Sequence, residues 1–457
     1  MSRRVLGCDA LFDGISWYTP GFIEVEAGRV RRVGTGAEGV TEQVAGVVLP
    51  GIPNLHSHAF QRAFAGETEQ SAGNGKDSFW SWREAMYRFA ERLDPDAVEA
   101  IAEQVFLEML EAGYTSVAEF HYVHHASDGE PYADLAELGR RVAAAARSVG
   151  IRLTLLPVFY EAAGFGPKPI EAGQRRFYNS PERYLDLWQA LEREQDGLVS
   201  LGAAPHSLRA APLGSLNAVV REVKRRAPEA PIHIHIAEQL REVEECLAHH
   251  QRRPVELLLE GAAVDKTWCL VHATHLSSTE QVALGGAGVV AGLCPTTEAN
   301  LGDGIFPLGN FRQHSGRWGI GSDSQITLDP AQELRLLEYT QRLSLHARNT
   351  VLSGDEAGHS GMRLLSEALL GGAQALGSPV GRLLPNCPAD LICLDPAHPS
   401  LLGRDPETQV DSWIFASNRP AVARVMVNGQ WCVTEGRHDR RETVQRRFAN
   451  CLRRLTG

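Results

Sequence analysis

Hydrophobic and polar positions change their spacing twice along the chain. Near both ends, short apolar runs alternate with turn residues, a pattern typical of β-strands. Between the ends, apolar runs of strand length alternate with amphipathic helical stretches such as residues 94–112 and 330–345. The pattern therefore predicts an all-β region built from both chain ends and an α/β region between them.

Each chain end contributes only a few candidate strands. Residues 5–11 and 21–26 are candidate strands near the start, and residues 389–395 and 422–430 near the end. The last of these finishes in an Asn-Gly turn, which favours a hairpin. Neither end can bury a core alone, so we expect the two to pair into one small β-sandwich.

The middle of the chain predicts a (β/α)8 TIM barrel, with 71–76 as a Gly/Ser-rich loop in a long first insertion. One candidate strand is the apolar run Val47, Val48 and Leu49, which leads through Pro50 and Gly51 toward His56. Eight βα repeats in roughly 330 residues fit such a barrel. The other seven candidate strands are residues 115–120, 152–158, 197–203, 231–237, 267–271, 288–293 and 316–321.

The expected fold class is thus α/β, a barrel with a small β-sandwich. Residues 1–50 form the first part of the sandwich and residues 51–384 the barrel. Residues 385–457 complete the sandwich and add a terminal helix.

Metal-competent side chains follow the predicted strands at the end where a barrel carries its chemistry. His56 and His58 are two residues apart, so on extended chain they face the same side. Isoleucines alternate with His233 and His235 on the fifth strand; His235, nearer the strand end, is the predicted ligand, with His233 as the alternative. Asp323 adds a carboxylate after the eighth strand. Three histidines and one carboxylate fit Zn²⁺ with room for water, and Fe²⁺ is the alternative.

Other histidines have plainer interpretations. Taken alone, His56 and His58 are also compatible with two unrelated loop residues, and only the later strand ends favour the metal site. His249 and His250 fall on a polar helix and are expected in solvent, whereas 124–125 are expected on a loop surface.

Composition narrows the class of protein. The net charge of −11 and pI near 5.9 argue against a general nucleic-acid binder, although a local arginine cluster can still hold an anionic substrate. No apolar stretch of about 18 residues or signal-peptide pattern occurs, so we expect neither a membrane span nor export. The eight scattered cysteines contain no CxxC pair, which predicts reduced, packed thiols in a cytoplasmic protein rather than metal ligands.

In this order along the chain, the motifs His-x-His, His-x-x-Glu, His and Asp resemble the amidohydrolase superfamily. The stretch 381–395 resembles the strand by which that superfamily re-enters its β-sandwich. No lysine ends the fourth strand; His206 occupies that region, as in the one-metal deaminase branch. The resemblance implies one divalent metal per chain on His56, His58, His235 and Asp323.

Five further stretches resemble the branch of the superfamily that hydrolyses the C=N bond of N-formimino-L-glutamate to N-formyl-L-glutamate and ammonia. In that chemistry Asp323 accepts a proton from water and Glu238 donates protons to nitrogen. His272 steadies the attacking hydroxide beside the metal, with a fifth metal ligand as its alternative role. The stretches are residues 53–62, 81–83, 119–122, 205–209 and 294–304.

The implied substrate is a small dicarboxylate, which an acidic protein must hold with local positive charge. Arg209 and Arg83 are the candidates, because a guanidinium grips a carboxylate through two hydrogen bonds. The alternative for Arg83 is a surface residue paired with a nearby acid. Gln61, Tyr122 and His206 are further candidate hydrogen-bond partners at strand ends. A homodimer is implied by resemblance only.

Two other functions fit parts of the pattern. A nucleobase or S-adenosylhomocysteine-type deaminase would share the metal site, but its pocket would favour aromatic stacking over paired arginines. A metal-binding barrel without catalysis would have no need for Glu238, His272 and Asp323 together.

Overall fold

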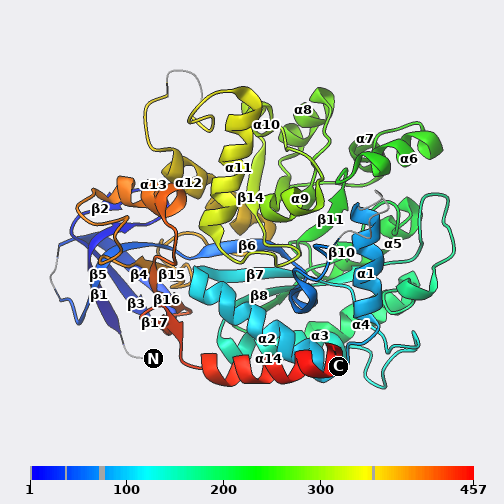
Figure 1. The fold of residues 1–457 in the computed structure, drawn as a ribbon, viewed down its shortest axis with the longest axis horizontal. Helices are drawn as coiled ribbons and strands as arrows, with labels where there is room; N and C mark the ends of the chain where they lie inside the picture. Colours follow the sequence, from blue (N-terminus) through cyan, green and yellow to red (C-terminus); the bar gives the residue numbers. More distant parts are fainter. Residues whose placement is uncertain (1–2, 37–38, 71–77, 353–355, 457) are drawn as a thin grey trace.

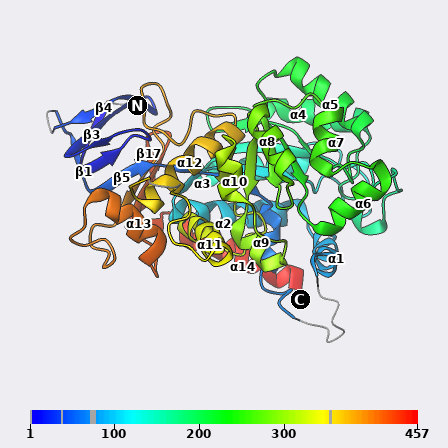
Figure 2. The ribbon, with the colours of Figure 1, turned by 90° about the horizontal axis from the view of Figure 1, so that it is seen from above.

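The computed structural model describes residues 3–36, 39–70, 78–352 and 356–456, so the predicted loop at 71–76 lies outside the described residues. Figure 1 shows a barrel wrapped by helices and, beside it, a smaller β-domain that contains strands from both ends of the chain. Figure 2 shows the same two parts from above, with the β-domain at one end of the molecule. None of the helices in the described ranges is long and apolar enough to span a membrane.

The barrel is built from two parallel sheets that meet at both edges. One sheet has the order β10-β8-β7-β6, with β9 paired to β8, and the other has the order β11-β12-β13-β14. Parallel bridges Ser57↔Asp323, Ala203↔Ile232 and Ser207↔His235 join the two sheets. The strands are β6 (Ile52–Ser57), β7 (Tyr114–His121), β8 (Arg152–Phe159), β9 (Val199–Leu201), β10 (Ala204–Pro205), β11 (Ile232–Ile236), β12 (Trp268–His272), β13 (Val290–Leu293) and β14 (Arg317–Ile320). With β9 and β10 sharing the fourth position, the predicted barrel is confirmed.

The first barrel strand is not the predicted one. The apolar run Val47–Leu49 belongs to β5 (Glu42–Pro50), which pairs with β1 and β15 in the β-domain. The barrel strand is the separate β6, and His56 lies within it rather than after a strand end. Pro53 and Asn54 are poor strand formers and hide β6 in the sequence, yet both are buried.

The two chain ends form one sheet, in the order β18-β17-β16-β15-β5-β1-β3-β4, with β2 paired to β1. Its apolar cluster takes residues from both ends, among them Leu6, Ile23, Leu391 and Met426. The predicted pairing of the ends is therefore confirmed. The strands are β1 (Arg4–Phe12), β2 (Trp17–Tyr18), β3 (Gly21–Glu26), β4 (Arg29–Thr35), β15 (Leu391–Leu394), β16 (Val422–Val427), β17 (Gln430–Thr434) and β18 (Arg437–His438).

The helices follow the predicted amphipathic stretches. Asp94 caps α2 by accepting from Ala97 N, and Asp329 caps α11 by accepting from Ala331 N, which fixes where both helices begin. The helices are α1 (Phe79–Ala90), α2 (Pro95–Ala112), α3 (Glu137–Val149), α4 (Pro181–Leu191), α5 (Leu213–Arg226), α6 (Leu240–His250), α7 (Pro254–Gly261), α8 (Ser278–Ala287), α9 (Pro295–Leu301), α10 (Leu308–Gln313), α11 (Pro330–Leu345), α12 (Ser360–Ala375), α13 (Pro406–Ala416) and α14 (Arg441–Thr456). The last of these packs against α2 (Figure 1), where Arg447 pairs with Glu99 and Glu103.

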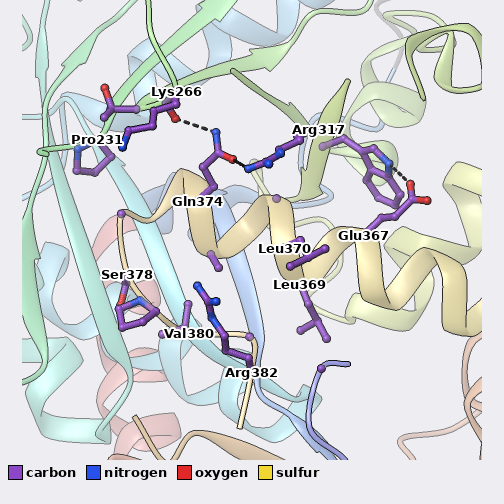
Figure 3. Close-up of a pocket in the computed structure, with 18 of the residues that line it drawn as sticks. Pro231, Lys266, Arg317, Glu367, Leu369, Leu370, Gln374, Ser378, Val380 and Arg382 are labelled. Carbon is purple, nitrogen blue, oxygen red and sulfur yellow. Dashed lines mark hydrogen bonds between the residues drawn. The ribbon is translucent and has the colours of Figure 1, made fainter. Parts of the chain in front are cut away.

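A cavity of about 690 Å³ lies at the end of the barrel where the strands begin (Figure 3). Gln374 on α12 lines the cavity. Its side chain donates to the Lys266 carbonyl oxygen at 2.8 Å and accepts from Arg317. Trp318 donates to Glu367 at 2.8 Å. None of the predicted site residues lines this cavity, so the candidate chemistry lies elsewhere, at the opposite ends of the strands.

Candidate functional site

Three histidines converge on one point at the carboxyl end of the barrel. His56 Nε2 lies 3.1 Å from His58 Nε2 and 3.0 Å from His235 Nε2. His58 Nδ1 donates to the Phe120 carbonyl oxygen at 2.9 Å, and His235 Nδ1 donates to the His206 carbonyl oxygen at 3.1 Å. Because the single N–H of each neutral ring is at Nδ1, His58 and His235 present the lone pair of Nε2 toward His56.

The charge state of these rings suits a cation. Burial lowers the pKa of His58 to about 3 and holds the pKa values of His56 and His235 well below the usual range, so all three imidazoles are neutral. Facing lone pairs repel unless a positive charge lies between them. The donor set therefore fits a divalent metal ion.

Asp323 brings a carboxylate to the same point. Its Oδ1 lies 3.3 Å from His58 Nε2 and 3.6 Å from His56 Nε2. Burial raises the pKa of the Asp323 carboxyl to about 7, against the opposing charge of His272. The backbone holds the pair of strands in register, because His58 N donates to Asp323 O and Asp323 N to His56 O, both at 3.0 Å. A Cβ at Gly321 would come within 2.9 Å of the His56 backbone, so only glycine allows this approach.

His233 lies away from the three converging histidines. Its Nε2 donates to the Ala375 carbonyl oxygen at 2.8 Å, and its side chain is fully buried. Of the two histidines on β11, the structure thus brings His235, not His233, to His56 and His58.

His272 is surrounded by carboxylates. Its Nε2 lies 3.7 Å from both Glu238 Oε1 and Asp323 Oδ2, and its Nδ1 lies 3.3 Å from Glu298 Oε1. Burial opposes charge on this ring, but Glu238, Glu298 and Asp323 raise the pKa of His272 well above its usual range. The group of possible metal ligands formed by His56, His58 and His235 does not include His272, which favours a place beside the metal over the fifth-ligand alternative.

The backbone turns sharply where these groups leave their strands. Ala237, His272 and Asp323 have φ values of 50°, 67° and 46°, in the left-handed region that non-glycine residues avoid. Each such residue costs on the order of 1–3 kcal/mol and is often found at functional sites. The turns redirect Glu238, His272 and Asp323 toward one another at the barrel mouth.

The predicted substrate-binding residues line one cavity with His58, His235, Glu238, His272 and Asp323. Gln61 Nε2 donates to Tyr122 Oη at 3.0 Å, and Tyr122 Oη lies 3.4 Å from the Met86 sulfur. The His206 ring lies 5.0 Å from the ring of His235. The structure therefore brings Gln61, Arg83, Tyr122, His206 and Arg209 together with the candidate metal ligands.

Arg83 and Arg209 have few hydrogen-bond and ion-pair partners in the structure. Arg209 is 6% exposed, and Arg83 is half-buried on α1. Within the described residues, neither guanidinium forms an ion pair, and the Nε of each is buried without a hydrogen-bond partner. The alternative of Arg83 as a surface residue paired with an acid is not what the structure shows.

Two acidic residues beside His272 were not predicted from the sequence as site residues. Asp303, in the stretch 294–304, is 5% exposed and reaches the neighbourhood of Glu238 and His272. Burial and the nearby Glu238 raise the pKa of Asp303 to about 9. The stretch was noticed, but its acids, Glu298 and Asp303, were not assigned to the site; two acids in a conspicuous loop after a barrel strand were the available signal.

Aromatic residues complete the cavity wall. Residues Phe79, Trp82, Tyr87, Tyr160 and Phe177 line it, several of them from α1. Trp82 falls in the resembling stretch 81–83 but was not assigned to the site, and no pattern in the sequence pointed to the other four.

The prediction for the pair at 124–125 was wrong. Both histidines are buried, at 2% and 0% exposure. The backbone N–H groups of His124 and His125 donate to the carbonyl oxygen of Arg176, which is itself 1% exposed. The segment around Arg176 thus covers the two histidines, and they pack as core residues.

Comparison with known proteins agrees with this geometry. The model of the amidohydrolase family matches residues 47–432. The formimidoylglutamate deiminase of Pseudomonas aeruginosa is 51% identical over 415 residues, which cover 91% of this chain and 90% of that protein. The crystal structure of an amidohydrolase from Brucella melitensis superposes with a TM-score of 0.94 at 43% identity, covering 99% of this chain and all of that one. An adenosine deaminase from Xanthomonas campestris with bound zinc shares the fold, at a TM-score of 0.80 and 19% identity, covering 99% and 98% of the two chains.

Proposed function

Because the chain belongs to the amidohydrolase family, we propose that it is a hydrolase that converts N-formimino-L-glutamate and water into N-formyl-L-glutamate and ammonia, a step of histidine degradation. This is the activity named for its 51% identical relative. The observation that carries the proposal is the content of one cavity. Convergent neutral histidines and an acid/base pair lie in it together with two arginines, one buried and one half-buried, that form no ion pair among the described residues.

For the ion we propose zinc, one per chain, held by His56, His58, His235 and Asp323. Three imidazole nitrogens and one carboxylate oxygen are a donor set that zinc favours, and ferrous iron is the alternative that metal analysis would reveal. When bound, the divalent metal supplies a Lewis acid that lowers the pKa of a coordinated water toward about 7.

The chain's own residues would move the protons. Asp323, which lies beside the three histidines at the barrel mouth, would accept a proton from the attacking water. Glu238 would donate its proton to the imino nitrogen, take up the proton that the water gave to Asp323, and deliver that second proton to the same nitrogen. The C–N bond then breaks with ammonia as the leaving group, and the hydroxyl proton of the adduct returns to Glu238 as the C=O bond forms. The His272 imidazolium, held by Glu298, would donate a hydrogen bond to the oxygen that attacks.

The arginines would hold the glutamyl part. Both substrate carboxylates are ionised at neutral pH, since their pKa values lie near 4. Arg209 and Arg83 offer donors that are buried and unused, and Gln61, Tyr122 and His206 offer neutral hydrogen bonds beside them.

The alternative is another one-metal deaminase. Aromatic rings do line the cavity, which a nucleobase would use for stacking. A neutral base would leave the charges of Arg83 and Arg209 without a counter-charge, whereas a dianion would neutralise both. The dicarboxylate is therefore the favoured substrate. A barrel without catalysis would leave Glu238 and His272 unexplained.

We also propose a cytoplasmic location, on the ground that all eight cysteines are unpaired thiols. A homodimer is proposed from family resemblance alone.

The test is ammonia release by purified, metal-analysed protein. N-formimino-L-glutamate is compared with adenosine, S-adenosylhomocysteine, guanine and cytosine at equal concentration. We expect ammonia from the first substrate and little from the others. Faster release from any of the ring substrates would overturn the proposal.

A further inference from the structure

Three guanidinium groups surround one indole ring at the barrel mouth. The Cζ atoms of Arg83, Arg209 and Arg241 lie 4.5, 5.6 and 4.3 Å from the ring centroid of Trp80. The residues come from different parts of the chain: Trp80 and Arg83 from α1, Arg209 from the segment after β10, and Arg241 from α6. Each distance is within the range of a cation–π contact, and tryptophan is the best aromatic partner for one.

The three arginines differ in the ion pairs and hydrogen bonds that their guanidinium groups form. Arg241 is exposed and pairs with Glu245 at 2.7 Å. Arg83 and Arg209 have no ion pair among the described residues and keep a buried, unpartnered Nε. Trp80 is the aromatic ring that Arg83 and Arg209 share, although Arg83 also lies 5.5 Å from the Tyr87 ring centroid and nearby Glu242 favours the charged form of Arg209.

Trp80 does not itself line the cavity that Arg83 and Arg209 line. It lies behind them, on the helix whose residues Phe79, Trp82 and Tyr87 face the cavity. An aromatic face attracts each cation without using its N–H groups, so those groups stay available to carboxylates. Two like charges are thereby held close together and ready for a dianion.

We propose that Trp80 is a positioning residue that sets the preference for a dicarboxylate by holding Arg83 and Arg209 in place. The inference rests on the proposed function for the identity of the substrate, but its central claim concerns affinity for two carboxylates. Holding the arginines before binding reduces the entropy lost when the substrate is bound.

The experiment measures binding and turnover separately. Glutarate, a dicarboxylate that cannot react, is titrated by calorimetry into the metal-loaded enzyme, and kcat and KM are measured with N-formimino-L-glutamate and with uncharged formamidine. For Trp80→Leu we expect glutarate affinity to fall, and KM for formiminoglutamate to rise, by about tenfold to a hundredfold, the loss of one to two cation–π contacts. We expect kcat to change by less than about threefold, and metal content and formamidine turnover to stay as in the wild type.

Three further variants make the result specific. Trp80→Phe keeps a ring face and should lose less glutarate affinity than Trp80→Leu. Trp80→Met also removes the ring and replaces the leucine variant if that variant folds poorly. The matched control is Trp431→Leu in the β-domain, which removes the contact of Arg424, 3.7 Å from the Trp431 centroid, and should leave glutarate binding unchanged.

The outcomes separate the two proposals. Glutarate binding at the wild-type affinity in Trp80→Leu, or in Trp80→Met should the leucine variant not fold, overturns the role of Trp80 whatever the turnover. An equal loss with formamidine also overturns it, because the residue would then support α1 in general. A wild type that binds glutarate but releases no ammonia from formiminoglutamate refutes the proposed function and leaves the positioning role standing.

Discussion

Replacing Arg209 with methionine tests how the chain holds a dianion. The methionine keeps much of the apolar stem and removes the charge, at a position that is 6% exposed. Arg209 has no ion pair among the described residues, so a substrate carboxylate would be its main partner. Burial opposes the charge, yet Glu242, Tyr160 and Glu238 raise the pKa of Arg209, so the side chain is charged when the substrate arrives.

The expected magnitude follows from burial. Removing one member of a desolvated charge pair typically loses about 2–5 kcal/mol, and each 1.4 kcal/mol is about a factor of ten. Arg83 stays beside the same indole ring and still neutralises part of the substrate charge, which excludes the upper end. We therefore expect kcat/KM for N-formimino-L-glutamate to fall by about thirtyfold to a thousandfold.

The assay is steady-state ammonia release, with metal content measured on the same preparation. Formamidine has no carboxylate, so its turnover should fall much less. The matched control is Arg241→Met, the same substitution near the same ring at an exposed residue that has its own acid, Glu245; we expect less than about a threefold change, since exposed ion pairs contribute little. Equal losses with both substrates would make Arg209 structural, and no loss with either would refute the reasoning and make Arg83 the next residue to test.

Three other predictions follow from the site. Glu238→Gln should keep the metal and lower kcat by about 10²–10⁴-fold, as loss of a positioned acid/base does; near-normal turnover would show that Glu238 moves no proton. Elemental analysis should find one divalent metal per chain, lost in His56→Ala, and removing it from the wild type with a chelator should lower Tm, because ligand binding stabilises the folded state; two metals per chain, unaffected by His56→Ala, would contradict the site. The pKa of Asp303 is raised in the folded state to about 9 from about 4 in the unfolded chain, so this carboxyl lowers stability progressively as pH rises between those values. Asp303→Asn should thus gain Tm relative to the wild type as pH rises from 5 to 9, and a constant difference would refute the shift.

The sequence predicted the barrel well because its signals are local. On β11 the isoleucines alternate with His233 and His235, and this alternation alone placed both histidines on the barrel side. The choice between the two needed only the direction of the strand. The domain boundaries near residues 50 and 384 stay predictions.

Other features depend on contacts that no local pattern contains. Strand β6 was missed because Pro53 and Asn54 weaken its strand character, while burial and pairing with β7 override that preference. His124 and His125 looked exposed because their cover, Arg176, comes from a distant loop. Trp80 could not be assigned because its three arginine contacts bring together α1, α6 and the end of the fourth barrel strand.

The pairing of β5 with β15 has a consequence for the order in which the chain folds during synthesis. Pro50, at the end of β5, is in register with Leu391, and Gly51 N donates to Asp390 O at 2.9 Å. Everything between these residues is the barrel, so the ribosome must make the barrel before β5 acquires this neighbour. Closing so long a loop is slow, and until then one edge of β5 is open to pairing with other chains. Because β6 begins directly after this junction, the segment that carries His56 and His58 gains its last backbone anchor only when the final part of the chain has emerged.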